Sequence, residues 1–247
     1  QRETPMASNQ ELYQQRQQLN DALFEAAEQG SLADIQSLLD RHADINARDC
    51  YDSHTPLHYA SMKGHHQCIE LLLDRHADIN ALGDTGSTAL HFVSSNGHHQ
   101  CIEILLDRHA DVNALGYNNF TPLHRASLIG HHQCVEILLD RHADINALGY
   151  NNNTPLHLAS LKENRRCIEI LLDYGADKSL INVRLSLSLS MCKHLSHECI
   201  NNHQSIPTHH SHSMISQQIK GHTPDQCAYD SSIVELIQNH GTSIHPS

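Results

Sequence analysis

The sequence predicts an all-α solenoid in which stacked helix-turn-helix pairs are joined by β-hairpin loops. A Thr-Pro-Leu-His motif, or its Thr-Ala-Leu-His variant, returns every 33 residues from Thr55 to Thr154. Each copy is followed by an apolar run of Cys, Ile and Leu, and then by Ala-Asp-Ile/Val-Asn. Aromatic residues make up only 4% of the chain and Trp is absent, so a large aromatic core is excluded. Self-similarity at such a period is typical of stacked repeats, in which each unit contacts only its neighbours.

The N-terminal part is expected to lead into an atypical first unit. Residues 1–19 are predicted to be a polar tail that becomes helical, and helical spacing continues through Leu19, Leu23 and Phe24. Residues 20–49 carry the second half of the repeated pattern but lack the Thr-Pro-Leu-His motif. A terminal unit with charged residues on its outer side suits a solvent-facing end of a stack. We therefore predict an N-terminal capping repeat over residues 20–49.

Four full repeats are predicted over residues 50–181. In each repeat the motif Thr is expected to cap the first helix. Where Pro follows it, the ring occupies the first turn, where a missing N–H costs nothing. A short turn leads to a second helix that is apolar on both flanks, as burial between two neighbours requires. The four repeats span residues 50–83, 84–116, 117–149 and 150–181.

This period and motif resemble the ankyrin-repeat family, and the resemblance covers at least residues 30–181. It implies that the motif His is buried and hydrogen-bonds neighbouring repeats together. The residues concerned are His58, His91, His124 and His157.

One position departs from the family pattern. Ankyrin repeats usually carry Gly at the end of the second helix, where the chain adopts the left-handed conformation. A histidine there is expected to cost up to about 1 kcal/mol relative to Gly. The histidines at this position are His42, His76, His109 and His142, whereas Gly175 keeps the family residue.

The repeated pattern breaks after residue 181. Residues 182–220 are rich in Ser and His, and we interpret them as an insertion or a degenerate repeat. Thr223-Pro224 and a following apolar run then restore part of the pattern. Residues 221–247 are therefore predicted to be a degenerate C-terminal capping repeat and tail.

Charge and cysteine usage limit the partners and the compartment. The formal net charge of −12 argues against binding to nucleic acid, which needs a surplus of Lys and Arg. No apolar run is long enough to span a membrane, and no signal-peptide pattern is present. Four of the eight Cys recur at one repeat position and are expected to be buried and reduced. We therefore expect a cytoplasmic or nuclear protein that is monomeric alone, with a secreted microbial effector as an open alternative.

No motif predicts catalysis or a cofactor. The chain has no glycine-rich phosphate loop, no Gly-x-Ser-x-Gly and no His-Glu-x-x-His, and its carboxylates mostly recur at repeated structural positions. A Cys/His tract over residues 192–212 offers ligand types that zinc prefers, but its spacing fits no usual zinc module. We predict no metal site; the weak candidates are Cys192, His194, His197 and Cys199.

The positions that differ between the repeats predict a binding surface. The family resemblance implies that the hairpin tips and the exposed side of each first helix form a concave face that contacts partners. Exposed aromatic and aliphatic side chains there suit the centre of an interface. The predicted partner-binding residues are Tyr51, Asp52, Met62, Lys63, Asp84, Thr85, Ser95, Asn96, Tyr117, Asn118, Phe120, Leu128, Ile129, Tyr150, Asn151, Leu161 and Lys162.

These observations predict a non-enzymatic scaffold or adaptor that binds another protein through its concave face. Two alternatives remain open at this stage. The chain could be an adaptor or inhibitor subunit that contacts its partner through residues 182–220, or a metal-binding protein that uses the tract over residues 192–212.

Overall fold

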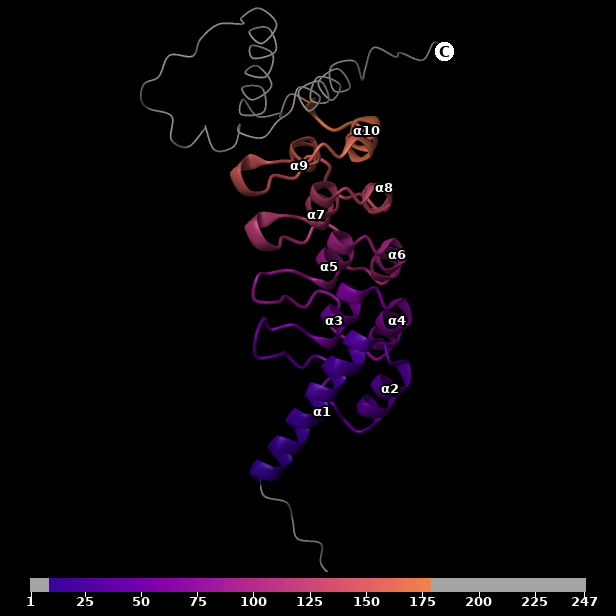
Figure 1. Cartoon of the computed structure of the whole chain (residues 1–247), viewed down its shortest axis with the longest axis vertical. Coiled ribbons are helices and arrows are strands. Elements are labelled where there is room, and N and C mark those ends of the chain that lie inside the picture. Colours follow the sequence, from indigo (N-terminus) through magenta and orange to yellow (C-terminus); the bar gives the residue numbers. More distant parts are fainter. Residues whose placement is uncertain (1–8, 179–247) are drawn as a thin grey trace, which may run out of the picture.

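The computed structural model describes residues 9–178, in which paired helices stack into an elongated body (Figure 1). The helices of the first two pairs are α1 (Asn9–Gln29), α2 (Leu32–Asp40), α3 (Pro56–Lys63) and α4 (His66–Asp74). The next two pairs are α5 (Ala89–Asn96), α6 (His99–Asp107), α7 (Pro122–Ile129) and α8 (His132–Asp140). The last pair is α9 (Pro155–Leu161) and α10 (Arg165–Asp173), and two 3-10 turns are η1 (Tyr117–Asn119) and η2 (Tyr150–Asn152).

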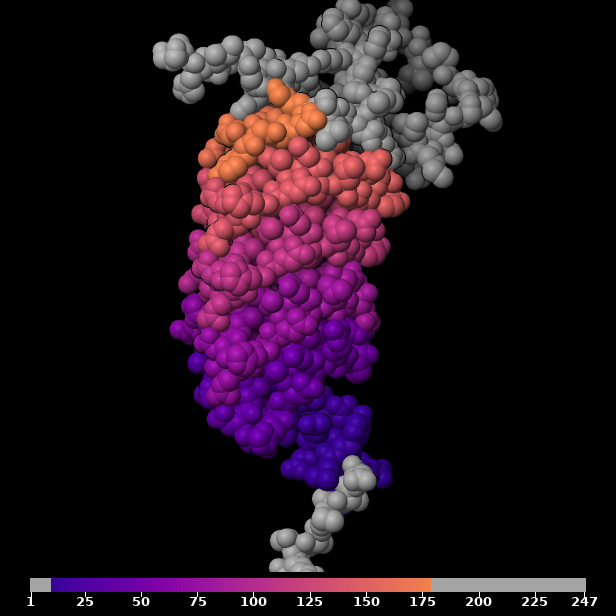
Figure 2. Space-filling model, turned by 180° about the vertical axis from the view of Figure 1, so that it is seen from behind, coloured from indigo at the N-terminus to yellow at the C-terminus, as the bar shows by residue number. Residues whose placement is uncertain are grey.

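The helices form two parallel columns. The inner helices α1, α3, α5, α7 and α9 contact one another in that order, and the outer helices α2, α4, α6, α8 and α10 do the same. Loops project from the inner column, on the side away from the outer helices (Figure 1). From behind, the described residues form one continuous body in which successive units follow the chain order (Figure 2). The predicted all-α solenoid is confirmed.

Each inner helix of the four full repeats begins at the motif Thr, as predicted. The backbone N–H of Thr121 donates to Nδ1 of His124 at 3.1 Å, and the backbone N–H of His124 donates to Oγ1 of Thr121 at 3.4 Å. The same reciprocal arrangement occurs at Thr154, and at Thr55 and Thr88 the backbone N–H of Thr likewise donates to Nδ1 of the motif His. Two of the N–H groups that a helix start leaves without a partner are thereby satisfied.

Each outer helix ends in the left-handed conformation predicted from the sequence. His109 has φ 65°, and its N–H donates to Leu106 O, while the N–H of Ala110 donates to Leu105 O, both at 3.0 Å. This pair of bonds is the Schellman arrangement, which satisfies the last carbonyls of a helix. His42, His76 and His142 have φ values of 67°, 67° and 64°, and Gly175 has φ 87°.

One apolar core runs the length of the stack. The inner helices of the four full repeats bury the Leu of the motif, and the outer helices α4, α6, α8 and α10 each bury a Cys, a β-branched residue and two Leu. Cys68, Cys101, Cys134 and Cys167 are buried free thiols, as predicted. Desolvation raises the pKa of Cys101 to about 11 and that of Cys134 to about 12, so both remain protonated thiols at neutral pH.

One local feature agrees with the expected description and one differs from it. The first inner helix, α1, continues through residues 19 and 20, as the helical spacing predicted, and it packs on α3. The loops have the shape of hairpins, but no β-strand occurs within residues 9–178. A single backbone hydrogen bond closes each loop, which is too few for a strand ladder.

Several predictions concern residues outside the described range. These are the N-terminal tail before residue 9, the segment over residues 182–220, the C-terminal cap over residues 221–247 and the four weak metal candidates. None of the helices between residues 9 and 178 combines the length and apolarity needed to cross a bilayer.

Candidate functional site

Four loops and the adjoining inner helices form the surface on which the repeats differ, which we call the groove surface. The loops span residues 49–54, 83–87, 116–120 and 149–153. In each loop the backbone N–H of the first residue donates a hydrogen bond to the carbonyl of the last residue. The N···O distances are 3.0, 3.1, 2.9 and 2.9 Å in that order. The loops thus hold their tips at corresponding places along the stack.

The first loop is held by a carboxylate, and the last two are held by left-handed Asn residues. Asp49 accepts hydrogen bonds from the backbone N–H groups of Tyr51, Asp52 and His54, at 2.7, 2.8 and 3.0 Å. In the last two loops Gly replaces that Asp, and a 3-10 turn takes over. The positive-φ residues of these two turns are Asn118, Asn119, Asn151 and Asn152, and Asn adopts the left-handed conformation more readily than most residues.

The motif histidines connect each inner helix to the next loop, as the family resemblance implied. Nδ1 of His91 accepts the N–H of Thr88 at 3.1 Å, so Nε2 carries the proton. That Nε2–H donates to the carbonyl of Phe120, one repeat onward, at 2.8 Å. His58 and His124 contact the carbonyls of Ser87 and Asn153 in the same way, at 3.2 and 2.9 Å. These bonds fix the position of each loop relative to the helix before it.

Burial keeps these histidines neutral. Desolvation lowers the pKa of His58, His91 and His124 to about 4 in each case. Their environment is therefore that of a structural hydrogen-bonding group rather than a proton carrier near neutral pH.

Most of the predicted partner-binding side chains are exposed on the groove surface. Tyr51 is 83% exposed, Leu161 63%, Tyr117 56% and Ile129 54%. Tyr150, Asp52, Lys63, Asp84, Thr85, Asn96, Asn151 and Lys162 are also exposed, and Met62, Ser95, Asn118 and Leu128 are half-buried. Exposed apolar groups thus cluster on the last two full repeats, from the loop over residues 116–120 to the end of α9.

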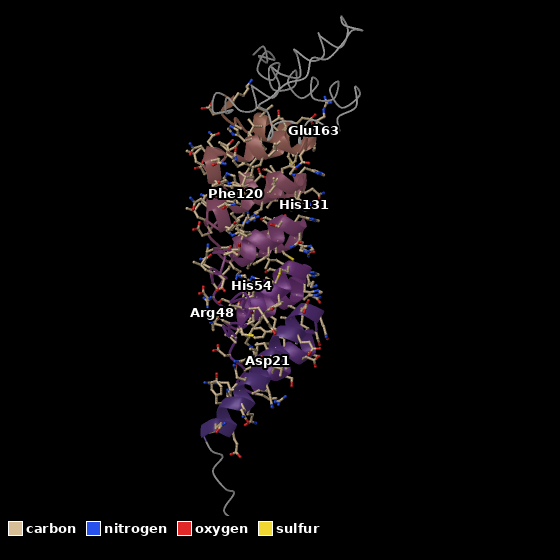
Figure 3. All side chains as sticks on the ribbon, turned by 60° about the vertical axis from the view of Figure 1, so that its left-hand side comes forward. Asp21, Arg48, His54, Phe120, His131 and Glu163 are labelled. Atoms are coloured by element: carbon tan, nitrogen blue, oxygen red, sulfur yellow. The ribbon has the colours of Figure 1, made fainter. Side chains whose placement is uncertain are left out.

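The prediction that Phe120 is an exposed anchor is wrong, because its side chain is only 8% exposed. The ring stacks on His124 with centroids 5.2 Å apart, and the guanidinium of Arg125 lies 5.6 Å from its centroid. A Cβ at Gly149 would lie 2.5 Å from the ring, so the missing side chain of Gly149 makes room for it. Phe120 therefore holds two loops together, and Figure 3 labels it on the loop side of the stack with Arg48 and His54.

The sequence-based prediction also missed three exposed leucines. Leu82, Leu115 and Leu148 are 50%, 59% and 54% exposed, and they recur at one position immediately before the Gly that opens each loop. The prediction was drawn from positions that vary between repeats, whereas Leu recurs at this position. An apolar residue recurring at a loop position was the available signal.

The outer column offers a contrasting surface. Arg75, Arg108 and Arg141 each pair with an Asp of the preceding repeat, at 3.2, 2.8 and 2.8 Å. Tyr174 takes the place of Arg in the last unit and donates to Asp140 at 2.6 Å. These charges are satisfied within the stack itself. No group of three potential metal ligands occurs among residues 9–178.

Comparison with known families agrees with this geometry. The family model for ankyrin repeats (3 copies) matches residues 23–116 and 109–182. No curated protein matches the chain.

Proposed function

Because the chain belongs to the ankyrin-repeat family, whose repeats are generally protein–protein interaction modules, we propose that it is a non-enzymatic scaffold that binds another protein through the groove surface. The observation that carries the proposal is the row of exposed apolar side chains along this surface. Its last two full repeats expose Tyr117, Ile129, Tyr150 and Leu161, and the recurring leucines directly before the loops are exposed as well.

Exposed apolar groups in a row favour an interface over a solvated surface. Water contact with apolar area costs about 25 cal/mol for each Å², and soluble proteins rarely gather such groups without a use. Tyr side chains add large contact area with few rotatable bonds, which is why they often dominate binding energy. The inter-repeat hydrogen bonds of the motif histidines hold this surface in place before binding, so little ordering is needed.

We further propose a monomeric protein of a reducing compartment such as the cytoplasm. Cys50 is an exposed free thiol, and the four recurring Cys are buried thiols. Exposed thiols are poorly suited to oxidising compartments.

The first test compares two double variants of the same repeat. Leu128→Ala with Ile129→Ala removes apolar groups from the groove end of α7, whereas Gln133→Ala with Glu136→Ala changes exposed groups on outer helix α8. Affinity capture with mass spectrometry is expected to return a set of proteins with the wild-type chain and with the outer variant. We expect the groove variant to lose members of that set.

Circular dichroism provides the control, because all three proteins should show the same helicity and cooperative unfolding. If the groove variant is folded and retains the same proteins as the wild type, the groove surface is not where partners bind.

A further inference from the structure

The charges of the groove surface are unevenly distributed along the stack. Toward the N-terminus, the carboxylates of the loops and of α1 outnumber the cations. The carboxylates there are Glu11, Asp21, Glu25, Glu28, Asp49, Asp52 and Asp84, and the cations are Arg16, Arg48 and Lys63. Toward the C-terminus, residues 116–129 and 149–162 contain no carboxylate, and their cations are Arg125 and Lys162. The groove surface therefore has an acidic end and an apolar, weakly basic end.

The acidic end is built around Tyr59 of α3. The Tyr59 hydroxyl donates to Asp49 at 3.0 Å, and the rings of Phe24 and His54 lie 5.8 and 6.0 Å from its ring. Burial raises the pKa of Tyr59 to about 12, with added contributions from the hydrogen bond to Asp49 and the charges of Asp49 and Glu28. The negative charges of α1 and of the first loop thus both act on a site that is lined by half-buried aromatic rings.

Not all of these carboxylates are available to a partner. Asp49 already accepts hydrogen bonds from its own loop and from the Tyr59 hydroxyl, and Glu28 forms an ion pair with Lys63 at 3.1 Å. Asp52 and Asp84 are exposed, and neither forms an ion pair within residues 9–178. The two residues belong to adjacent loops that are joined directly, because the N–H of Asp84 donates to the Asp52 carbonyl at 2.9 Å.

We propose that the groove surface binds a peptide segment of a partner protein that carries Lys or Arg at one end and apolar residues at the other. Its basic side chain lies at Asp52 and Asp84, and its apolar side chains cover Leu128, Ile129 and Leu161. The inference rests on the proposed function and specifies the chemistry of the partner. The reverse direction is disfavoured, because it would bring like charges together at Arg125 and Lys162.

The spacing of the repeats determines how far apart the basic and the apolar residues of the bound segment must be. Equivalent positions in neighbouring helix pairs lie about 8–10 Å apart, and Leu128 and Leu161 lie one and two repeats beyond Asp84. An extended segment rises about 3.3 Å per residue. The basic and apolar residues of the segment should therefore be separated by at least about three to six residues, because Leu128 and Leu161 also lie at the ends of α7 and α9 farthest from the loops.

The test is selection of random displayed peptides of about 12 residues, which are long enough when extended to span four repeats. The full chain serves as the target. We expect the selected peptides to carry Lys or Arg at a fixed separation and direction from apolar residues. Their affinity is then measured for Asp52→Asn with Asp84→Asn, and for the control Glu70→Gln with Glu103→Gln on the outer helices of the same repeats.

Loss of two exposed ion pairs should weaken binding to the first variant about fivefold, and the loss should shrink as salt is added. The control should bind as the wild type does. Selected peptides without basic residues, or equal binding to all three proteins, would overturn the inference.

The variant Leu128→Ala with Ile129→Ala separates this inference from the proposed function. If that variant binds the peptides more weakly and the Asp variant does not, the groove surface binds partners but the charge assignment fails. If neither variant weakens binding, both proposals fail. Selection that enriches no peptide on the wild-type chain counts against both as well.

Discussion

At the scale of single residues, a histidine occupies the left-handed end of an outer helix where glycine would be free of strain. His109 adopts φ 65° and is exposed, so its ring gains little from packing. Replacing it with Gly removes the clash between Cβ and the following carbonyl. We expect His109→Gly to raise the free energy of unfolding by up to about 1 kcal/mol in urea titration. A lowered denaturation midpoint would contradict this.

The last unit provides the reverse control. Gly175 stands at the same position with φ 87°, and a Cβ there would meet no heavy atom of residues 9–178 within 4 Å. Gly175→His should therefore destabilise the protein through backbone strain alone, by an amount similar to the gain at His109.

Four buried Ser hydroxyls also lower the stability of the folded protein. Ser61, Ser94, Ser127 and Ser160 occupy one position of the inner helices, and the Oγ of each has no hydrogen-bond partner among the described residues. A buried hydroxyl without a partner costs about 1–3 kcal/mol, whereas Ala adds no polar group and favours the helix.

We expect Ser94→Ala to raise the free energy of unfolding by about 1 kcal/mol or more, measured by chemical denaturation. Ser95 is the matched control, because it follows in the same helix and is half-buried rather than sealed. Ser95→Ala should gain only the helix-propensity difference of about 0.5 kcal/mol. Equal gains at the two positions would show that the buried hydroxyl carries no penalty.

At the scale of the repeated element, the motif histidines make stability depend on pH. The pKa of His58, His91 and His124 is about 4 in the folded protein, against about 6.5 in the unfolded chain. Well above pH 6.5 these histidines are neutral in both the folded and the unfolded chain, so their full contribution to the free energy of unfolding is present. Below it the unfolded chain binds protons that the folded chain does not, so stability falls as pH drops from about 6.5 to about 4.

The expected loss is about 1.4 kcal/mol per histidine for each pH unit in that window, measured by urea denaturation from pH 7.5 to 4.5. His91→Gln should reduce the slope, whatever it does to stability at pH 7.5. A slope that is unchanged in this variant would mean that other groups control the acid response.

Features that recur in every repeat could be predicted from the sequence, whereas a contact specific to two repeats could not. The period and the motif predicted the Thr caps, and the resemblance to ankyrin repeats implied the bridging histidines and the left-handed histidines, because each depends on backbone geometry that recurs in every unit. The inward position of Phe120 depends instead on one pairing, in which the ring fills the space left by Gly149 in the next loop. Such a pairing between two units cannot be read from the pattern of a single unit.

At the scale of the whole molecule, one side of the stack is regular and the other varies. Arg75, Arg108 and Arg141, which directly follow outer helices α4, α6 and α8, each pair with an Asp of the preceding repeat, so this contact repeats along the column. The groove surface changes from carboxylates around Tyr59 to apolar groups around Ile129. The net charge of −12 argued against nucleic acid as a partner, but it did not locate the acidic end.

Hydrogen exchange of the chain with and without a captured partner tests most directly whether recognition occurs on the groove surface. Loop amides exchange quickly unless they are covered, so binding should slow exchange in the loops over residues 116–120 and 149–153 and at the adjoining end of α7. The account predicts this protection together with unchanged exchange in α6 and α8. Protection confined to the outer helices, or to residues after 178, would contradict it.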